Sequence, residues 1–306
     1  MVMLGEIFYW VFNMSLIGSC MGLIVLAIRA IKTIPRRIAV LLWLVPFGRM
    51  AVPLWLNSRL SLMTLISRFT TRTVTVLQPS DDLAFSFTNT VMAANSYFPI
   101  TYRVNVLDGV FRVGAVVWAI GAASLLLALG MVYSATLREV RSARHLRENI
   151  YLSEKVTSPA VYGVFRPRIV IPAGWEERDL TYILAHESAH IRCLDNLWRL
   201  LAFAVTAVHW FNPLAWLFLK LLLGDLELAC DERAIAGYDD DRRRAYAHAL
   251  LDCAGDRSLF ASAFGGAKVR TRIENVLSFR RMTWLSGAGF AALVGAILLS
   301  LLTNAG

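Results

Sequence analysis

Long stretches without charge constrain this chain more than any other feature of its sequence. No Asp, Glu, Lys or Arg lies within residues 7–28, 113–135 or 282–306. Each stretch is long enough for the ~20 apolar residues that a helix needs to cross a bilayer. Residues 38–56 form a similar window that contains Arg49, and a charge at such a depth usually faces the interior of a helix bundle. We therefore predict an integral membrane protein with four transmembrane helices, one in each window.

The overall composition excludes an ordinary soluble domain. Hydrophobic residues make up 57% of the chain and charged residues only 17%, whereas soluble domains carry about 25% charged residues. Disordered chains are poor in apolar side chains, so disorder is excluded as well. The net charge of +9 suits a nucleic-acid partner or a cationic cytoplasmic membrane face, and an apolar chain favours the second. The four cysteines show no disulfide or zinc-site spacing, so we expect reduced thiols in the cytoplasm.

Basic residues border the predicted membrane helices, at 29–37, 138–147 and 280–281. Short loops rich in Lys and Arg face the cytoplasm. This rule predicts a membrane region at 1–135 with an outer loop at 57–112, and a cytoplasmic domain at 136–281. The arginines at every third position from Arg138 predict a basic stripe on a helix, facing lipid headgroups or solvent. Direct contact with nucleic acid is not expected, because the basic residues follow the membrane boundary.

The sharpest chemical signal is the run His186-Glu187-Ser188-Ala189-His190. Two histidines four residues apart project from the same face of a helix. Zinc takes two imidazole nitrogens in this arrangement, with a third ligand from elsewhere and an open position for water. Glu187, next to the first histidine, is placed to accept a proton from that water. We therefore predict one Zn²⁺ ion held by His186 and His190, with Glu187 as the catalytic base of a metalloendopeptidase.

A third ligand is expected from a segment that turns back toward the histidines. Residues 200–219 carry no charge, but a single crossing of the bilayer would leave any later acid about 30 Å from His190. Pro213 disfavours helix at Asn212 and suits the first turn of a new helix. The sequence therefore predicts a helical hairpin, either partly embedded in the bilayer or simply buried.

The returning helix carries several acidic residues near its end. Glu227 and Asp231 are four residues apart and share one helix face. We assign Glu227 as the third metal ligand and Asp231 as the acceptor that orients a ligand histidine. Asp225 and Glu232 point elsewhere on the helix, so we expect them to be solvated.

These motifs resemble a known family. The zinc motif 186–190, Asp195, the run His209-Trp-Phe-Asn-Pro-Leu-Ala-Trp216 and the run Glu227-Leu-Ala-Cys-Asp-Glu232 are similar to the BlaR/MecR-type antirepressor membrane zinc metallopeptidases. The resemblance implies a mainly α-helical membrane protein of the bacterial inner membrane. It also implies a cytoplasmic α+β gluzincin-like peptidase domain between the third and fourth helices, and a BlaI/MecI-type transcriptional repressor as substrate.

The resemblance has one limit. Family members that sense β-lactams carry a penicillin-binding sensor after the fourth helix, and the sequence here ends at Gly306. We therefore expect this chain to lack that sensor, so direct acylation by a β-lactam does not carry over. Self-cleavage between the peptidase domain and the last helix is implied by the resemblance, and we place it at Ser278-Phe279.

Other functions stay open at this point. An HtpX-like quality-control protease would use the same chemistry on membrane proteins, and a zinc-bound scaffold would signal without cleaving. Glu187 argues against the scaffold, because a site that only binds metal needs no general base. Tyr246 and His248 follow the acidic helix and are candidates for stabilising an oxyanion. A homodimer is also compatible with the sequence.

Overall fold

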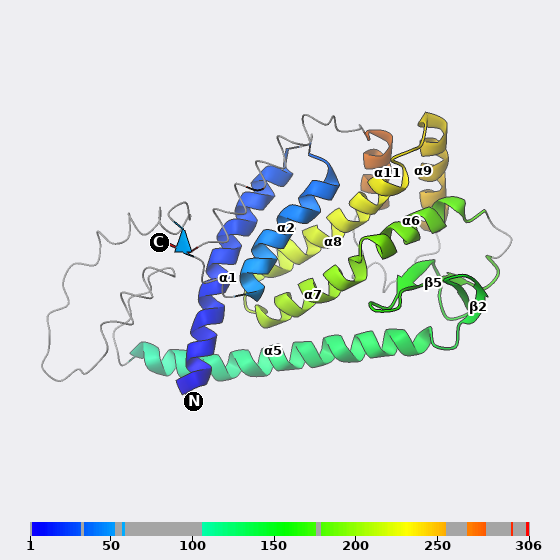
Figure 1. The fold of residues 1–306 in the computed structure, drawn as a ribbon. Coiled ribbons are helices and arrows are strands. Elements are labelled where there is room, and N and C mark those ends of the chain that lie inside the picture. Colours follow the sequence, from blue (N-terminus) through cyan, green and yellow to red (C-terminus); the bar gives the residue numbers. More distant parts are fainter. Residues whose placement is uncertain are drawn as a thin grey trace, which may run out of the picture.

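The computed structural model describes residues 2–31, 34–52, 57–58, 106–175, 179–254, 268–279, 295 and 304–305. Helices dominate these residues, and one small sheet lies beside them (Figure 1). A second, two-stranded parallel pair joins β1 (Asn57–Ser58) to β6 (Asn304–Ala305). The predicted outer loop at 57–112 and the predicted fourth membrane helix at 282–306 fall almost entirely outside the described residues.

Within the part of the chain that the structure describes, two helices are long and apolar enough to cross a membrane. They are α1 (Val2–Arg29), apolar from Met3 to Arg29, and α5 (Val106–Glu139), apolar from Phe111 to Glu139. Both coincide with predicted membrane helices, and α5 is the longer of the two. Only 11% of the most apolar window of α5 is buried within the protein. A helix with so much exposed apolar surface fits a lipid environment rather than water.

The second predicted membrane helix corresponds to α2 (Arg36–Ala51), which packs beside α1 (Figure 1). Its 16 residues are fewer than the ~20 that span a bilayer, and residues 53–56 lie outside the described part of the chain. Arg49 is 1% exposed. The expectation that this arginine faces the interior of the bundle is therefore confirmed. A topology with four crossings remains a prediction.

A helical hairpin follows the zinc motif. Helix α7 (Asp195–Val208) ends before Asn212, and α8 (Pro213–Ala234) begins at Pro213 and runs back beside it (Figure 1). The Asn212 side chain accepts the N–H of Leu214 at 2.9 Å and caps α8. The predicted break at Asn212-Pro213 is thus confirmed, because proline suits the first turn of a helix and asparagine suits the cap.

The hairpin shares an apolar core with α1 and α2. This core includes Trp43 of α2 and Phe218, Leu222 and Leu226 of α8, all buried. Gly22 of α1 allows the close approach, since a Cβ atom there would lie 2.0 Å from the ring of Phe218. The helix that carries the acidic residues is therefore packed directly against the first two helices of the chain.

Polar groups at the hairpin turn are paired inside this core. Asn212 Nδ2 donates to the hydroxyls of Ser15 at 2.8 Å and Ser19 at 2.7 Å on α1. Nε2 of His209 lies 3.1 Å from the carbonyl oxygen of Met50, and His209 is fully buried. Buried polar groups need such partners, so these contacts fix the depth of the hairpin against α1 and α2.

The small sheet has the order β2-β3-β5-β4. Its strands are β2 (Arg144–Arg147), β3 (Ile150–Ser153), β4 (Ala160–Tyr162) and β5 (Arg168–Pro172). One face packs on α6 (Thr181–Arg192) through an apolar cluster that contains Leu152, Ile169 and Leu184. Strand β4 is an edge strand, but Asn196 of α7 donates to its carbonyl at Val161 and to that of Gly163, both at 3.0 Å.

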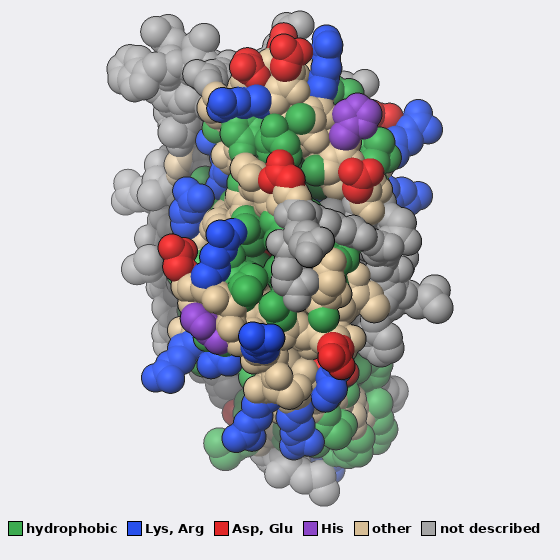
Figure 2. Space-filling view, turned by 90° about the vertical axis from the view of Figure 1, so that its right-hand side faces the viewer, with side chains coloured by type: hydrophobic (Ala, Val, Ile, Leu, Met, Phe, Trp, Pro, Cys, Tyr) green, Lys and Arg blue, Asp and Glu red, His purple; other side chains and the backbone are tan. Residues whose placement is uncertain are grey.

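The predicted arginine stripe on one helix is wrong. Helix α5 ends at Glu139, and Arg144 and Arg147 lie in strand β2. The four arginines from Arg138 to Arg147 are nevertheless all exposed. Figure 2 shows the right-hand side of the molecule in Figure 1, and on this face Lys and Arg side chains are more frequent than Asp and Glu.

Candidate metal centre

The two histidines of the zinc motif lie on α6, with Asp179 at its start accepting the N–H of Thr181 at 3.0 Å. His186 and His190 are one turn apart and are each 6% exposed. Their Nε2 atoms lie 3.1 Å from each other. The helix therefore presents both imidazoles to one point, as the spacing predicts.

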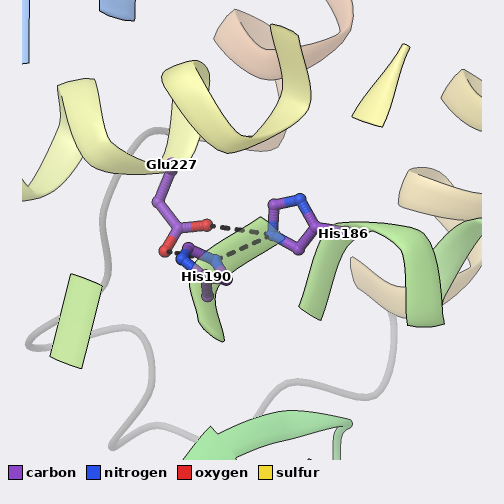
Figure 3. Close-up of side chains that lie close together, drawn as sticks. All are labelled: His186, His190 and Glu227. Atoms are coloured by element: carbon purple, nitrogen blue, oxygen red, sulfur yellow. Dashed lines mark hydrogen bonds and ion pairs between the residues drawn. The ribbon is translucent and has the colours of Figure 1, made fainter. Parts of the chain in front are cut away.

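Glu227 reaches the same point from α8 (Figure 3). Its Oε2 lies 3.6 Å from Nε2 of His186, and its Oε1 lies 3.7 Å from Nε2 of His190. Ligand atoms 2.0–2.2 Å from a tetrahedral ion are about 3.3–3.6 Å apart. The observed separations of 3.1, 3.6 and 3.7 Å lie within about 0.2 Å of this range, so the three side chains can supply the ligand set of a divalent metal, two nitrogens and one carboxylate. Positive neighbours also outweigh burial and hold the pKa of Glu227 well below its ordinary value.

Asp231 stands behind the first histidine, one helical turn after Glu227. Its Oδ1 lies 3.1 Å from Nδ1 of His186. The hydroxyl of Tyr246 donates to the same oxygen at 2.7 Å, and Arg272 donates to both oxygens at 2.7 and 2.8 Å. These contacts outweigh burial and lower the pKa of Asp231. The structure thus places Asp231 where an orienting acceptor is expected, with Nδ1 of His186 engaged and Nε2 directed toward Glu227.

The second histidine has an equivalent acceptor that the sequence reasoning did not assign. Asp195 Oδ2 lies 2.7 Å from Nδ1 of His190, and the thiol of Cys230 donates to the same oxygen at 2.8 Å. Leu194 adopts a left-handed conformation with φ of 54°, which lets α7 begin immediately with Asp195. The only signal for this role was the position of Asp195 five residues after His190 in the family motif.

His190, Asp195 and Cys230 also hold their possible ligand atoms within 4.8 Å of one another. However, burial and Asp195 raise the pKa of the Cys230 thiol, and only a thiolate is a good metal ligand. We therefore describe this group as a hydrogen-bonded support for His190 and not as a second metal site.

Glu187 occupies the position next to His186 on α6 and is 8% exposed. Arg199 of α7 forms an ion pair with Glu227, so a positive charge faces the carboxylate from the hairpin side. Neither predicted oxyanion group fits that role. The Tyr246 hydroxyl is buried between Asp231 and His186, where it lies 3.1 Å from Nδ1, and His248 is exposed to solvent.

The prediction that Asp225 and Glu232 are solvated is wrong. Asp225 is fully buried and accepts hydrogen bonds from Arg29 at 2.6 and 3.0 Å and from the Trp43 indole at 2.9 Å. Glu232 is 4% exposed and accepts the backbone N–H of Arg36 at 3.0 Å. Basic residues that the sequence assigns to the membrane surface thus pair with acids on the helix of Glu227.

Comparison with known proteins identifies the family of this chain. A family model described as BlaR1 peptidase M56 matches residues 9–277, which include all the residues of the metal cluster. The regulatory protein BlaR1 of Bacillus licheniformis is 27% identical over 216 residues, which are 60% of this chain and 36% of that protein. The methicillin resistance mecR1 protein of Staphylococcus aureus is 24% identical over 108 residues, 34% of this chain and 18% of that protein. The chain therefore covers about a third or less of these relatives.

The family match extends over most of the chain, from α1 through the zinc motif, the hairpin and α11 (Val269–Leu277). The two long apolar helices are consistent with membrane insertion. The chain therefore belongs to the BlaR1-type M56 family of membrane metallopeptidases.

Proposed function

We propose that this chain is a zinc endopeptidase with one Zn²⁺ ion bound by His186, His190 and Glu227. The observation that carries the proposal is the convergence of these three side chains, from two helices, within 3.1–3.7 Å of one another. Two imidazoles and one carboxylate with an open position are typical of catalytic zinc sites. The supports behind both histidines, Asp231 and Asp195, strengthen the proposal, because metal-bound histidines usually have such partners.

Peptide hydrolysis follows from the residues around this point. A bound zinc ion supplies a Lewis acid and lowers the pKa of its water ligand to about 7. Glu187 accepts the proton of the attacking water and delivers it to the leaving amine nitrogen as the C–N bond breaks. Asp231 and Asp195 engage Nδ1 of each histidine, so that Nε2 is the nitrogen left to bind the ion once the imidazole is neutral. The role of the surrounding chain is therefore to orient ligands and to move one proton.

We place the active site on the cytoplasmic side of a bacterial inner-membrane protein with four transmembrane helices. The contact between Asp225 and Arg29, the last residue of α1, supports this position. Asp225 is two residues before Glu227, so the metal cluster lies near the end of α1 that carries basic residues. The positive-inside rule assigns that end to the cytoplasm.

The substrate we propose is a transcriptional repressor of the BlaI/MecI type, so that cleavage would release transcription. The name of one relative, the regulatory protein BlaR1, and the similarity to the methicillin resistance protein mecR1 support this assignment. We extend the proposal to self-cleavage at Ser278-Phe279. This bond lies directly after α11, and the Phe279 ring packs beneath the guanidinium of Arg243 at 5.4 Å.

The proposal is tested by co-expressing the chain with candidate repressors in bacteria. We expect repressor fragments with the unchanged chain and none with Glu187→Gln, which retains all three metal ligands. Glu154→Gln serves as the matched control because Glu154 is an exposed carboxylate outside the site. Fragments of equal size and amount with Glu187→Gln would refute the proposed activity. Metal analysis of the purified chain identifies the ion.

A further inference from the structure

Four helices meet at the carboxylate of Asp231. His186 comes from α6, Asp231 from α8, Tyr246 from α9 (Asp240–Ala254) and Arg272 from α11. Three of these side chains contact the carboxylate within 2.7–3.1 Å. Arg272 differs from the other three residues because its helix follows α6, α8 and α9 in the sequence. It lies on the segment that leads toward the predicted last membrane helix.

The Arg272 guanidinium is fixed by paired contacts. Its Nε donates to Oδ2 of Asp231 at 2.8 Å, and its Nη2 donates to Oδ1 at 2.7 Å. Nη1 lies 3.5 Å from Oε2 of Glu227. Two parallel N–H···O bonds of this kind fix orientation as well as distance. Arg272 is 2% exposed, so its charge is compensated by these carboxylates and not by water.

The guanidinium supports His186 without taking its metal-binding position. Nη2 lies 3.1 Å from Nε2 and 3.4 Å from Nδ1 of the same imidazole. The lone pair of Nε2 lies in the ring plane and points away from Nδ1. An atom that binds this lone pair would therefore be much farther from Nδ1 than from Nε2, whereas Nη2 is at nearly the same distance from both. The lone pair of Nε2 therefore remains directed toward His190 and Glu227, whose atoms complete the cluster.

Helix α11 packs against α8 and α9 through apolar contacts on the same face as Arg272. Val276, four residues after Arg272, is fully buried in a cluster with Ile235, Tyr246 and Ala247. Residues four apart lie on one side of a helix. Docking of α11 and the contact of Arg272 with Asp231 are therefore parts of one arrangement.

We propose that Arg272 is a positioning residue of the metal centre, which couples the docking of α11 to metal binding. Arg272 holds Asp231 against Nδ1 of His186, so the metal binds more tightly when α11 is docked. By reciprocity, bound metal holds α11 in place by the same factor. The inference rests on the proposed metal site but not on the proposed substrate. It gives the segment after the catalytic helices a direct influence on the ligand shell.

The first test measures zinc affinity by competition with a chromophoric chelator, using the full chain in detergent micelles. All proteins carry Glu187→Gln, which prevents self-cleavage. We expect Arg272→Gln to bind zinc about 10–100-fold more weakly, the usual effect of losing a supporting partner. Arg272→Lys, which keeps the charge but not the paired geometry, should lie between. Arg270→Gln is the matched control, because Arg270 is exposed on the same helix and pairs with Glu274 rather than with the metal cluster.

The outcome distinguishes an effect of Arg272 on the orientation of the metal ligands from an effect of its positive charge. Equal or tighter zinc binding by Arg272→Gln would overturn the proposal, since loss of a nearby positive charge alone favours a cation. Cobalt substitution provides a spectroscopic check, because the visible absorption of Co²⁺ depends on ligand geometry. We expect an altered spectrum for Arg272→Gln and an unchanged one for Arg270→Gln. If the parent binds no divalent metal, both the proposed function and this inference fail.

The second test needs no change at Arg272. Trypsin is added to the Glu187→Gln chain with and without zinc, and cleavage after Lys268 and Arg270 is compared with cleavage after Arg141. All three residues are exposed, but Arg141 lies in the turn after α5. We expect zinc to slow cleavage at Lys268 and Arg270 at least several-fold more than at Arg141. Equal rates with and without zinc would refute the coupling while leaving the proposed proteolytic function intact.

Discussion

Asp195 and Cys230, on two different helices of the hairpin, meet behind His190, where one carboxylate oxygen accepts from the imidazole at 2.7 Å and from the thiol at 2.8 Å. The carboxylate has no proton to give, so Nδ1 of His190 must donate. This hydrogen bond fixes the tautomer of the ring and directs the lone pair of Nε2 toward Glu227.

Replacing Asp195 should weaken metal binding without removing a ligand. For Asp195→Asn we expect zinc affinity to fall about 10–100-fold, because the orienting charge behind His190 is lost. Chelator competition on the detergent-solubilised chain measures this change. Asp252→Asn, at an exposed carboxylate of α9, should bind zinc as the unchanged chain does. An affinity for Asp195→Asn equal to that control would show that the contact has no role in metal binding.

Substitution of two glutamates near the metal cluster should distinguish metal binding from catalysis. Glu227→Gln removes a predicted ligand, so zinc affinity should fall by more than the about 100-fold seen for supporting residues. Glu187→Gln should retain the zinc content of the parent and lose peptidase activity. Metal analysis after gel filtration, together with a cleavage assay, distinguishes the two. Full zinc content in Glu227→Gln would contradict the assignment of the third ligand.

Zinc affinity should rise with pH between 7 and 9. Burial and Arg272 oppose protonation of His186, but hydrogen bonds to Asp231 and Glu227 outweigh them and raise its pKa to about 9. Because a metal binds only the neutral imidazole, binding below pH 9 must release this proton. We expect affinity to increase up to about tenfold per pH unit and to level off above pH 9.

The control for this pH profile is Asp231→Asn, which removes the charge that favours protonated His186. Its profile should level off at a lower pH. Competition titrations at several pH values provide the comparison. A flat profile for the parent chain between pH 7 and 9 would contradict the raised pKa of His186.

Breaking the contact between α1 and α8 should destabilise the protein. Asp225→Asn leaves Arg29 and the Trp43 indole without the charge that pairs them. We expect a loss of about 3 kcal/mol, near the lower end of the range for a broken buried pair, because Arg29 keeps some contact with solvent. Thermal unfolding in detergent measures the effect. Glu274→Gln, which breaks an exposed pair with Arg270, should change stability by less than about 1 kcal/mol.

Local spacing was enough to predict the part of the site that lies on single helices. The four-residue spacing of His186 and His190 and that of Glu227 and Asp231 each define one helix face. Pro213 marks the start of α8 because proline has a local effect on the backbone. These features depend on neighbours within one or two turns, and the structure has both helices where the sequence predicts them.

Contacts between distant parts of the chain could not be predicted in the same way. Arg272 and Asp231 are 41 positions apart, and Arg29 and Asp225 are 196 apart. Nothing in the spacing of these residues marks them as partners. Asp225 and Glu232 look like ordinary surface acids on a helix, and only the packing of α8 against α1 and α2 buries them. Similarly, Arg144 and Arg147 continue a helical spacing, but the pairing of β2 with β3 places them in a sheet.

The shared core of α1, α2 and α8 has a practical consequence for handling this protein. A fragment that begins at residue 136 would retain every metal ligand, yet it would leave Phe218, Leu219 and Leu222 without the neighbours that cover them. Such a fragment should aggregate or lose the hairpin that delivers Glu227. The peptidase domain therefore cannot be produced as an isolated fragment. Proteins made for purification or as gene fusions must include the amino-terminal helices.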